Sequence, residues 1–155
     1  MPVKPIPDGY HTATPYLIVK GAASALDFYK KALGATEIMR FPGPDGSVMH
    51  AEIQIGNSIL MLADENPAMG ARGPKTLGGS PISIMLYVED ADASFNKAVA
   101  AGAKVVRPLM DQFYDDRSGI VDDPFGHAWS ISTHKEDVPP DEMKKRAEAF
   151  MKQKA

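Results

Sequence analysis

The chain repeats one pattern of residues, and this repetition limits the folds that it can adopt. Leu33-Gly34-Ala35 resembles Ala101-Gly102-Ala103, 68 residues further on, and Gly56 corresponds to Gly126, 70 residues further on. A nearly constant offset indicates an internal duplication. Because half of 155 residues is small for an independent hydrophobic core, the two halves must pack together or against a partner chain.

The apolar periodicity of each half predicts the element order β-α-β-β-β. Strands are predicted where β-branched or alternating residues are closed by turns, and helices where apolar residues recur at three or four positions. In the first half the expected elements are a strand at 16–19, a helix from 22 to 33 and strands at 36–41, 48–55 and 58–63. In the second half they are a strand at 82–88, a helix capped by Asp90 and strands at 104–109, 117–122 and 127–133.

These elements predict one α+β domain over residues 1–155, made of two modules and a C-terminal helix. Module one covers about 12–64, a glycine- and proline-rich linker 65–80, module two about 81–134, and the helix 141–154. The helix carries Met143, Ala147, Phe150 and Met151 on one side. It is either a surface helix that covers apolar area or an arm for dimerisation.

The composition excludes several classes of function. The formal net charge of −3 favours neither nucleic acid nor an anionic membrane as a partner. The absence of cysteine excludes disulfides, thiolate metal sites and a cysteine nucleophile. We find neither a secretion signal nor an apolar run of spanning length, so we expect a cytoplasmic protein.

Polar residues alternate along the strand at 48–55. His50, Glu52 and Gln54 point to one side, and Ala51 and Ile53 point to the other. If the apolar residues face the helix, the polar ones face a concave surface. Three interpretations of these residues remain open. They line a small-molecule pocket, with His50 and Glu52 as an acid–base or hydrogen-bonding pair. Alternatively, they form part of an unusual metal site, or they are simply the solvated face of an open sheet.

Two further groups of residues have a structural and a functional interpretation. His127 and Trp129 alternate with Ser130 on the last strand, and we expect them to pack against a helix as a folding motif. Arg117, next to Asp115 and Asp116, either binds a carboxylate or phosphate of a ligand or forms an ion pair that stabilises the turn.

The sequence resembles the vicinal-oxygen-chelate superfamily, which includes glyoxalase I, bleomycin- and fosfomycin-resistance proteins and extradiol dioxygenases, and within it the PhnB-like branch. The resemblance rests on segments distributed over nearly the whole chain, namely Tyr10–Val19, His50–Glu52, Asp115–Gly119, Asp123–Trp129 and Thr133–Asp137. It implies that the modules form curled mixed sheets around a shared cavity, as in the glyoxalase/bleomycin-resistance fold. It also implies a homodimer.

The resemblance places the usual metal ligands near Thr14, Leu60 or Met61, Ser83 and Ser130. None of these is a histidine, aspartate or glutamate, and shifting the alignment by one residue brings none in. Divalent metals require carboxylate or imidazole donors in a fixed geometry. We therefore expect no metal site and no cofactor.

The leading hypothesis is a protein that binds a small organic molecule in the inter-module cavity. We expect apolar or stacking contacts from Tyr16, Met85 and Tyr87, orienting hydrogen bonds from His50, Glu52, Gln54, Ser83 and Ser130, and an anion contact from Arg117. One alternative is a metal-dependent lyase, isomerase or dioxygenase with a shifted site at His50 and Glu52. Another is a structural or interaction protein with a filled cavity. Whether the chain is an enzyme stays open.

Overall fold

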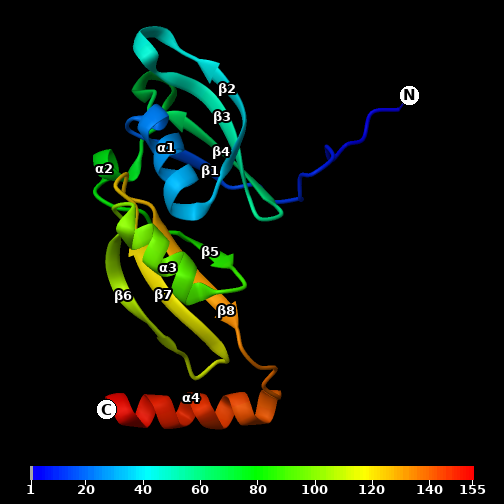
Figure 1. The fold of residues 1–155 in the computed structure, drawn as a ribbon, viewed down its shortest axis with the longest axis vertical. Coiled ribbons are helices and arrows are strands. Elements are labelled where there is room, and N and C mark those ends of the chain that lie inside the picture. The colour runs from blue at the N-terminus through cyan, green and yellow to red at the C-terminus, as the bar shows by residue number, and fades with distance from the viewer. Residues whose placement is uncertain (1) are drawn as a thin grey trace.

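The structure, a computed structural model, describes residues 2–155 and contains two modules with the same element order (Figure 1). The first module consists of β1 (Tyr16–Val19), α1 (Ala22–Leu33), β2 (Thr36–Pro42), β3 (Val48–Ile55) and β4 (Ser58–Asp64). The second consists of β5 (Ser83–Tyr87), α3 (Ala91–Ala100), β6 (Lys104–Asp111), β7 (Asp116–Asp122) and β8 (Ala128–His134). The α+β architecture expected from the duplication is confirmed.

Both modules form a four-stranded mixed sheet with the same topology. The strand orders are β1-β4-β3-β2 and β5-β8-β7-β6. The first and last strands of each module pair in parallel, and the other neighbours pair antiparallel. The glycine- and proline-rich linker between the modules contains the short helix α2 (Pro74–Leu77) and a 3-10 turn at Pro67–Met69.

Local sequence accounts for the C-terminal end of α1 and the N-terminal end of α3. Gly34 ends α1 with a φ of 66°, a left-handed conformation that glycine adopts without steric cost. Asp90 caps α3 by accepting a hydrogen bond from the amide of Ala93 at 3.0 Å, as the sequence predicts. In the first sheet, Ala51, Ile53 and Leu62 are buried on the side that packs against α1.

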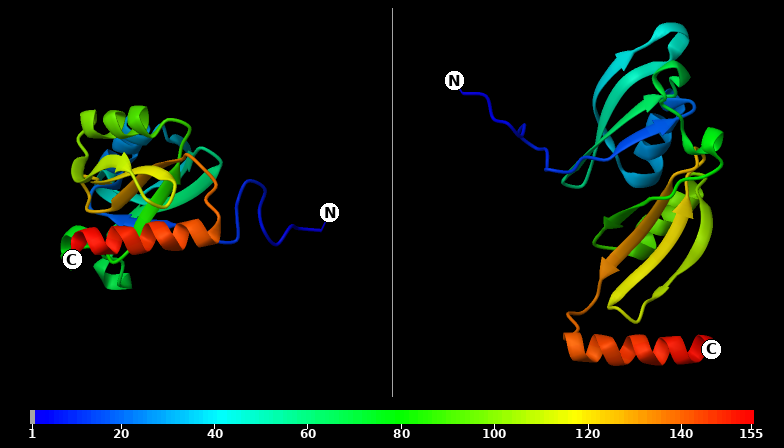
Figure 2. Two further views of the ribbon diagram at one scale, coloured as in Figure 1. Left: turned by 90° about the horizontal axis from the view of Figure 1, so that it is seen from below. Right: turned by 180° about the vertical axis from the view of Figure 1, so that it is seen from behind.

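The two sheets of one chain lie end to end, with α1 and α3 in contact at the junction (Figures 1 and 2). Over residues 2–155 they remain separate sheets and do not close into one barrel. The shared cavity that the resemblance implies is therefore not enclosed by the two sheets of a single chain. Each sheet turns the side opposite its helix outward.

A buried aspartate joins the modules at this junction. Asp123 accepts hydrogen bonds from the hydroxyl of Tyr29 in α1 at 2.7 Å and from the indole N–H of Trp129 in β8 at 2.8 Å. It also accepts the backbone amides of Phe125 and His127 at 2.9 and 3.0 Å. The rings of Tyr29 and Trp129 meet edge to face, with centroids 5.4 Å apart. The predicted packing against a helix is confirmed for Trp129, and the helix belongs to the other module. His127 instead contacts a strand, because its Nε2 lies 3.0 Å from the carbonyl of Ile18 in β1.

Two local features outside the site influence stability. Glu37 in β2 contacts Arg40 and Lys30, and their hydrogen bonds hold the pKa of its carboxyl at about 2, well below the ordinary value. Gly119 in β7 lies under the ring of Phe95, and a Cβ atom there would lie 2.5 Å from that ring and 3.0 Å from the backbone of Leu109. Only glycine fits this position without a shift of its neighbours.

The C-terminal helix α4 (Pro140–Lys154) lies beyond the tip of the β6–β7 hairpin (Figure 1). None of its residues is buried. Its aromatic contact is between Phe150 and Phe113, with ring centroids 4.8 Å apart. Among residues 2–155, no helix combines the length and the apolar character needed to cross a bilayer.

Candidate functional site

Strand β3 presents His50 and Glu52 on the side of the first sheet that faces away from α1. Because side chains alternate along a strand, the burial of Ala51 and Ile53 against the helix turns these two residues outward. The register then aligns Glu52 with Met61 of β4, and Met61 with Tyr16 of β1. This row of side chains crosses the open face of the sheet.

Four side chains on this face form a continuous hydrogen-bonded chain. The hydroxyl of Tyr16 lies 2.8 Å from Nδ1 of His50, and Nε2 of His50 lies 3.1 Å from Oε1 of Glu52. The hydroxyl of Tyr10, in the segment before β1, donates to Oε2 of Glu52. We call this chain, Tyr16–His50–Glu52–Tyr10, the polar row.

A neutral histidine satisfies every contact in the polar row. If Tyr16 donates its hydroxyl proton to Nδ1, the imidazole carries its single proton on Nε2 and donates it to Glu52. Glu52 then accepts two hydrogen bonds, one on each oxygen, and retains its full negative charge. The arrangement can orient a polar ligand, and it can accept or supply a proton through His50.

Glu52 is a buried carboxylate that stays ionised. Its side chain is 7% exposed, and this burial by itself raises the pKa of the carboxyl. The hydrogen bonds from Tyr10 and His50, together with the electrostatic attraction of His50, outweigh the burial, so the net pKa of Glu52 is lowered. The hydrogen bond between Tyr10 and Glu52 raises the pKa of Tyr10, because the tyrosine proton is shared with an anion.

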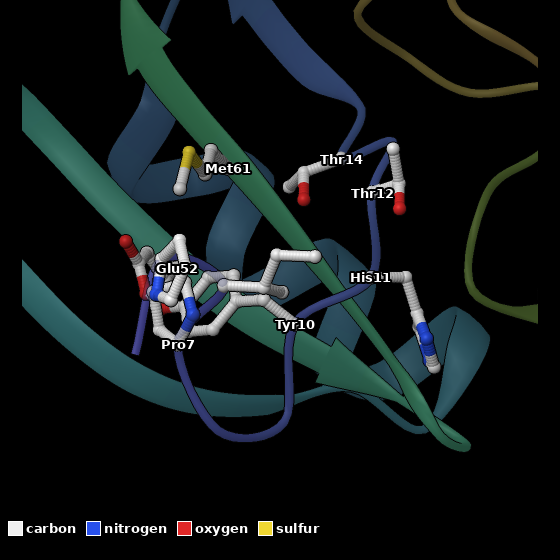
Figure 3. Close-up of a pocket in the computed structure, with 9 residues that line it drawn as sticks. Pro7, Tyr10, His11, Thr12, Thr14, Glu52 and Met61 are labelled. Carbon is white, nitrogen blue, oxygen red and sulfur yellow. The ribbon is translucent and has the colours of Figure 1, made fainter. Parts of the chain in front are cut away.

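A cavity of about 500 Å³ opens beside the polar row (Figure 3). One wall is the sheet, through Glu52 and Met61, and the other is the N-terminal segment. That segment contributes the remaining lining residues, which are Pro5, Ile6, Pro7, Tyr10, His11, Thr12 and Thr14. The volume lies within the range of small-molecule sites in proteins.

Most of this second wall was not predicted from the sequence. Tyr10 was assigned no ligand role, although it begins the first of the segments on which the family resemblance rests. Tyr10 and Glu52 are 42 residues apart, so local spacing could not have paired them. Leu60 and Met61 were alternatives for one of the family's metal-ligand positions, and the structure buries Leu60 in the core and turns Met61 into the cavity.

The second sheet carries a separate group of predicted residues on its outward face. Met85, Ser130 and Ile120 are aligned across β5, β8 and β7, and Tyr87 lies one step along the same face. The hydroxyl of Tyr87 donates to Asp116 at 2.9 Å. Ser130 continues a buried chain of hydroxyls with Ser118 (3.3 Å) and, through it, Ser132 (2.8 Å).

The remaining predicted residues lie apart from both groups. Gln54 bonds the carbonyl of Gly56 at 3.0 Å and does not line the cavity. Ser83, aligned with Ala128, is exposed at the start of β5. Arg117 lies on the helix side of its sheet. There its Nε and Nη2 donate hydrogen bonds to Asp92 of α3 at 2.6 and 2.8 Å, and its Nη1 donates to Asp111 at 3.3 Å. The ion-pair interpretation describes these contacts, and the partners are Asp92 and Asp111 rather than Asp115 or Asp116.

The four positions that the resemblance assigns to metal ligands carry poor donors for a divalent cation. The side chains at the four positions named by the resemblance are hydroxyls of Thr14, Ser83 and Ser130 and the thioether of Met61. Within the described part of the chain, no three histidine, aspartate or glutamate side chains gather in a metal-binding arrangement. His50 and Glu52 are directly bonded to each other.

Comparisons with known proteins agree with the fold. The chain is 48% identical over 133 residues to an uncharacterized protein of Mycobacterium bovis, covering 84% of this chain and 88% of the relative. The solved structure of protein PA1353 from Pseudomonas aeruginosa superposes with a TM-score of 0.66 at 30% identity, covering 81% of this chain and 99% of that one. The PhnB protein from Bacillus cereus has the same fold, with a TM-score of 0.63 at 18% identity, covering 79% of this chain and 99% of that one.

The sequence profile of one family spans most of the chain. It is the profile of the glyoxalase/bleomycin resistance protein/dioxygenase superfamily, and it matches residues 10–131. This range begins at Tyr10 in the cavity wall, includes the first sheet and the junction at Asp123, and ends within β8 of the second sheet. The chain therefore belongs to the glyoxalase/bleomycin resistance protein/dioxygenase superfamily.

Proposed function

We propose that this protein binds a small organic molecule in the cavity beside the polar row and does so without a divalent metal. The observation that carries the proposal is the 500 Å³ cavity with the buried carboxylate of Glu52 in its wall. Ligand sites typically combine apolar walls with a few well-placed polar groups. Here Met61, Ile6 and two prolines supply the apolar surface, and Glu52, Tyr10 and two threonines supply the polar groups.

The side chains at the family's ligand positions support the metal-free part of the proposal. Hydroxyl and thioether groups are poor ligands for the hard or borderline divalent ions that this fold would otherwise hold. Binding alone requires only affinity, so the loss of imidazole and carboxylate donors does not impair it. The protein should therefore retain its ligand after treatment with a chelator.

A ligand screen by thermal shift tests this proposal, since a molecule that binds only the folded state must raise Tm. Each hit is then titrated against two variants, Glu52→Ala and Gln54→Ala. Both alter polar residues on the outward side of β3, but only Glu52 lines the cavity. We expect Glu52→Ala to weaken binding at least tenfold and Gln54→Ala to leave it within about twofold, values that correspond to about 1.4 and 0.4 kcal/mol.

Circular dichroism and urea unfolding of the unliganded variants separate loss of binding from loss of folding. Equal effects of the two substitutions would refute the assignment of the site. Binding that disappears with chelation and returns with one equivalent of a divalent ion would refute the metal-free part.

We also propose that two copies form a homodimer, with the second module of one copy facing the first sheet of the other. The outward faces of both sheets expose large apolar side chains, Tyr16 and Phe41 on the first and Met85 and Tyr87 on the second. Apolar surface of this kind is typical of a protein interface. A partner module placed there would also bring the face around Ser130 close to the cavity.

Light scattering after size exclusion tests the dimer at micromolar concentration. We expect twice the chain mass for the unmodified protein and the single chain mass for Met85→Asp. Val99→Asp is the matched control, because Val99 is an exposed apolar residue on α3, away from both faces. A monomeric unmodified protein would contradict the proposal.

A further inference from the structure

The cavity beside the polar row has an unbalanced charge. Its lining includes the carboxylate of Glu52 but no lysine and no arginine. Lys4, the nearest lysine in sequence to the N-terminal wall, is paired with Asp8 at 2.6 Å. The one ion-pair partner of Glu52 within residues 2–155 is His50.

The hydrogen bonds of the polar row do not neutralise this charge. Tyr10 donates a neutral hydroxyl, and His50 needs only a neutral imidazole to make both of its contacts. The net lowering of the pKa of Glu52 agrees with a carboxylate that stays ionised. The imidazole in the lining belongs to His11, which bonds the carbonyl of Asn57 at 3.3 Å and points away from Glu52 (Figure 3).

Glu52 can accept further donors from a ligand. An ionised carboxylate has about four acceptor positions on its two oxygens, and Tyr10 and His50 occupy two of them. A buried anion with open acceptor positions is stabilised by an incoming cation and repels an incoming anion. A low local dielectric strengthens both effects, because Glu52 is 6% exposed.

We propose that this cavity selects small ligands that carry a protonated amine on an apolar body. The ammonium group donates to Glu52, and the apolar body packs on Met61 and on Ile6 and Pro7 of the opposite wall. The ring of Tyr10 and the hydroxyls of Thr12 and Thr14 also line the cavity in which the ligand would lie. This inference deepens the proposed function and rests on it.

Three probes of one shape and different charge test the inference at neutral pH. They are benzylamine as the cation, benzyl alcohol as the neutral analogue and benzoate as the anion. Binding is followed by NMR of the methionine methyl groups, in which Met61 reports on the cavity. We expect benzylamine to bind at least tenfold more tightly than benzoate, with benzyl alcohol between them.

Two variants separate the local charge from the overall charge of the protein. Glu52→Gln keeps the shape and removes the carboxylate, so the preference for benzylamine over benzoate should fall to within about twofold. Asp27→Asn makes the same change in net charge at an exposed position on α1 and should leave the preference intact.

The outcomes distinguish this inference from the proposed function. If benzoate binds as tightly as benzylamine, or if Glu52→Gln leaves the preference unchanged, the inference is wrong while the binding site stands. If none of the three probes perturbs Met61, the site itself is wrong, and the inference falls with it. Loss of the preference in Asp27→Asn would assign the effect to net charge and overturn the role of Glu52.

Discussion

Substitution of Asp123 by alanine should weaken the junction between the two modules. The carboxylate is 4% exposed and accepts four hydrogen bonds, two from the buried side chains of Tyr29 and Trp129 and two from backbone amides of its own turn. Alanine removes the acceptor and leaves all four donors in place. The cost therefore includes the penalty for donors that remain buried without a partner.

The magnitude follows from the two side-chain donors. Each buried donor left unpaired costs about 1–3 kcal/mol, and the turn amides add less because water can reach a loosened turn. We expect the free energy of unfolding to fall by about 3–5 kcal/mol. For a chain of this size, that change lowers Tm by on the order of 10 °C.

Urea unfolding followed by tryptophan fluorescence measures this loss at the junction itself. The chain contains a single tryptophan, Trp129, and its indole N–H is one of the affected donors. Far-ultraviolet circular dichroism should give the same midpoint if the two modules unfold together.

A double-mutant cycle with Tyr29→Phe tests the cause. Alone, Tyr29→Phe should cost about 1 kcal/mol, because it removes one hydrogen bond and leaves Asp123 three donors. Combined with Asp123→Ala it should cost nothing further, since the hydroxyl has already lost its acceptor. A loss under about 1 kcal/mol for Asp123→Ala, or full additivity in the double variant, would refute the reasoning.

Three further predictions concern single positions. The pKa of Glu37 is about 2 in the folded protein, so its ion pairs stabilise the fold above pH 5, and this stabilisation disappears as the pH falls toward 2. In Glu37→Gln, the free energy of unfolding should therefore fall by about 1 kcal/mol less between pH 5 and pH 2 than in the unmodified protein. The value is small because the ion pairs are at the surface. Asp115 has a φ of 89° and a buried oxygen with no hydrogen-bond partner among the described residues. Asp115→Gly removes both costs, so it should raise the free energy of unfolding by about 1 kcal/mol. A lower free energy of unfolding in urea would contradict this. Gly119→Ala should lower the free energy of unfolding by about 1–3 kcal/mol, because the new Cβ contacts the ring of Phe95. Replacing that ring with a smaller side chain, by Phe95→Leu in the same chain, should then recover part of the loss.

The element order and the ends of the helices followed from the sequence alone. Hydrophobic periods of two and of about 3.6 residues, with Gly34 and Asp90 at helix ends, are local properties, and the structure bears them out. The alternation around Ala51 also identified the outward side of β3 before the sheet was known. These predictions succeeded because side-chain direction in a strand or helix depends on near neighbours in the chain.

The tertiary structure determined which residues distant in the sequence are in contact. The bonds from Tyr10 to Glu52 and from Tyr29 to Asp123 join residues 42 and 94 positions apart, and Arg117 pairs with Asp92, 25 positions away. The same holds for the end-to-end placement of the sheets, which leaves each outward face open within one chain. Such contacts depend on how buried surfaces fit and on which polar groups need partners after burial, and residue spacing carries neither kind of information.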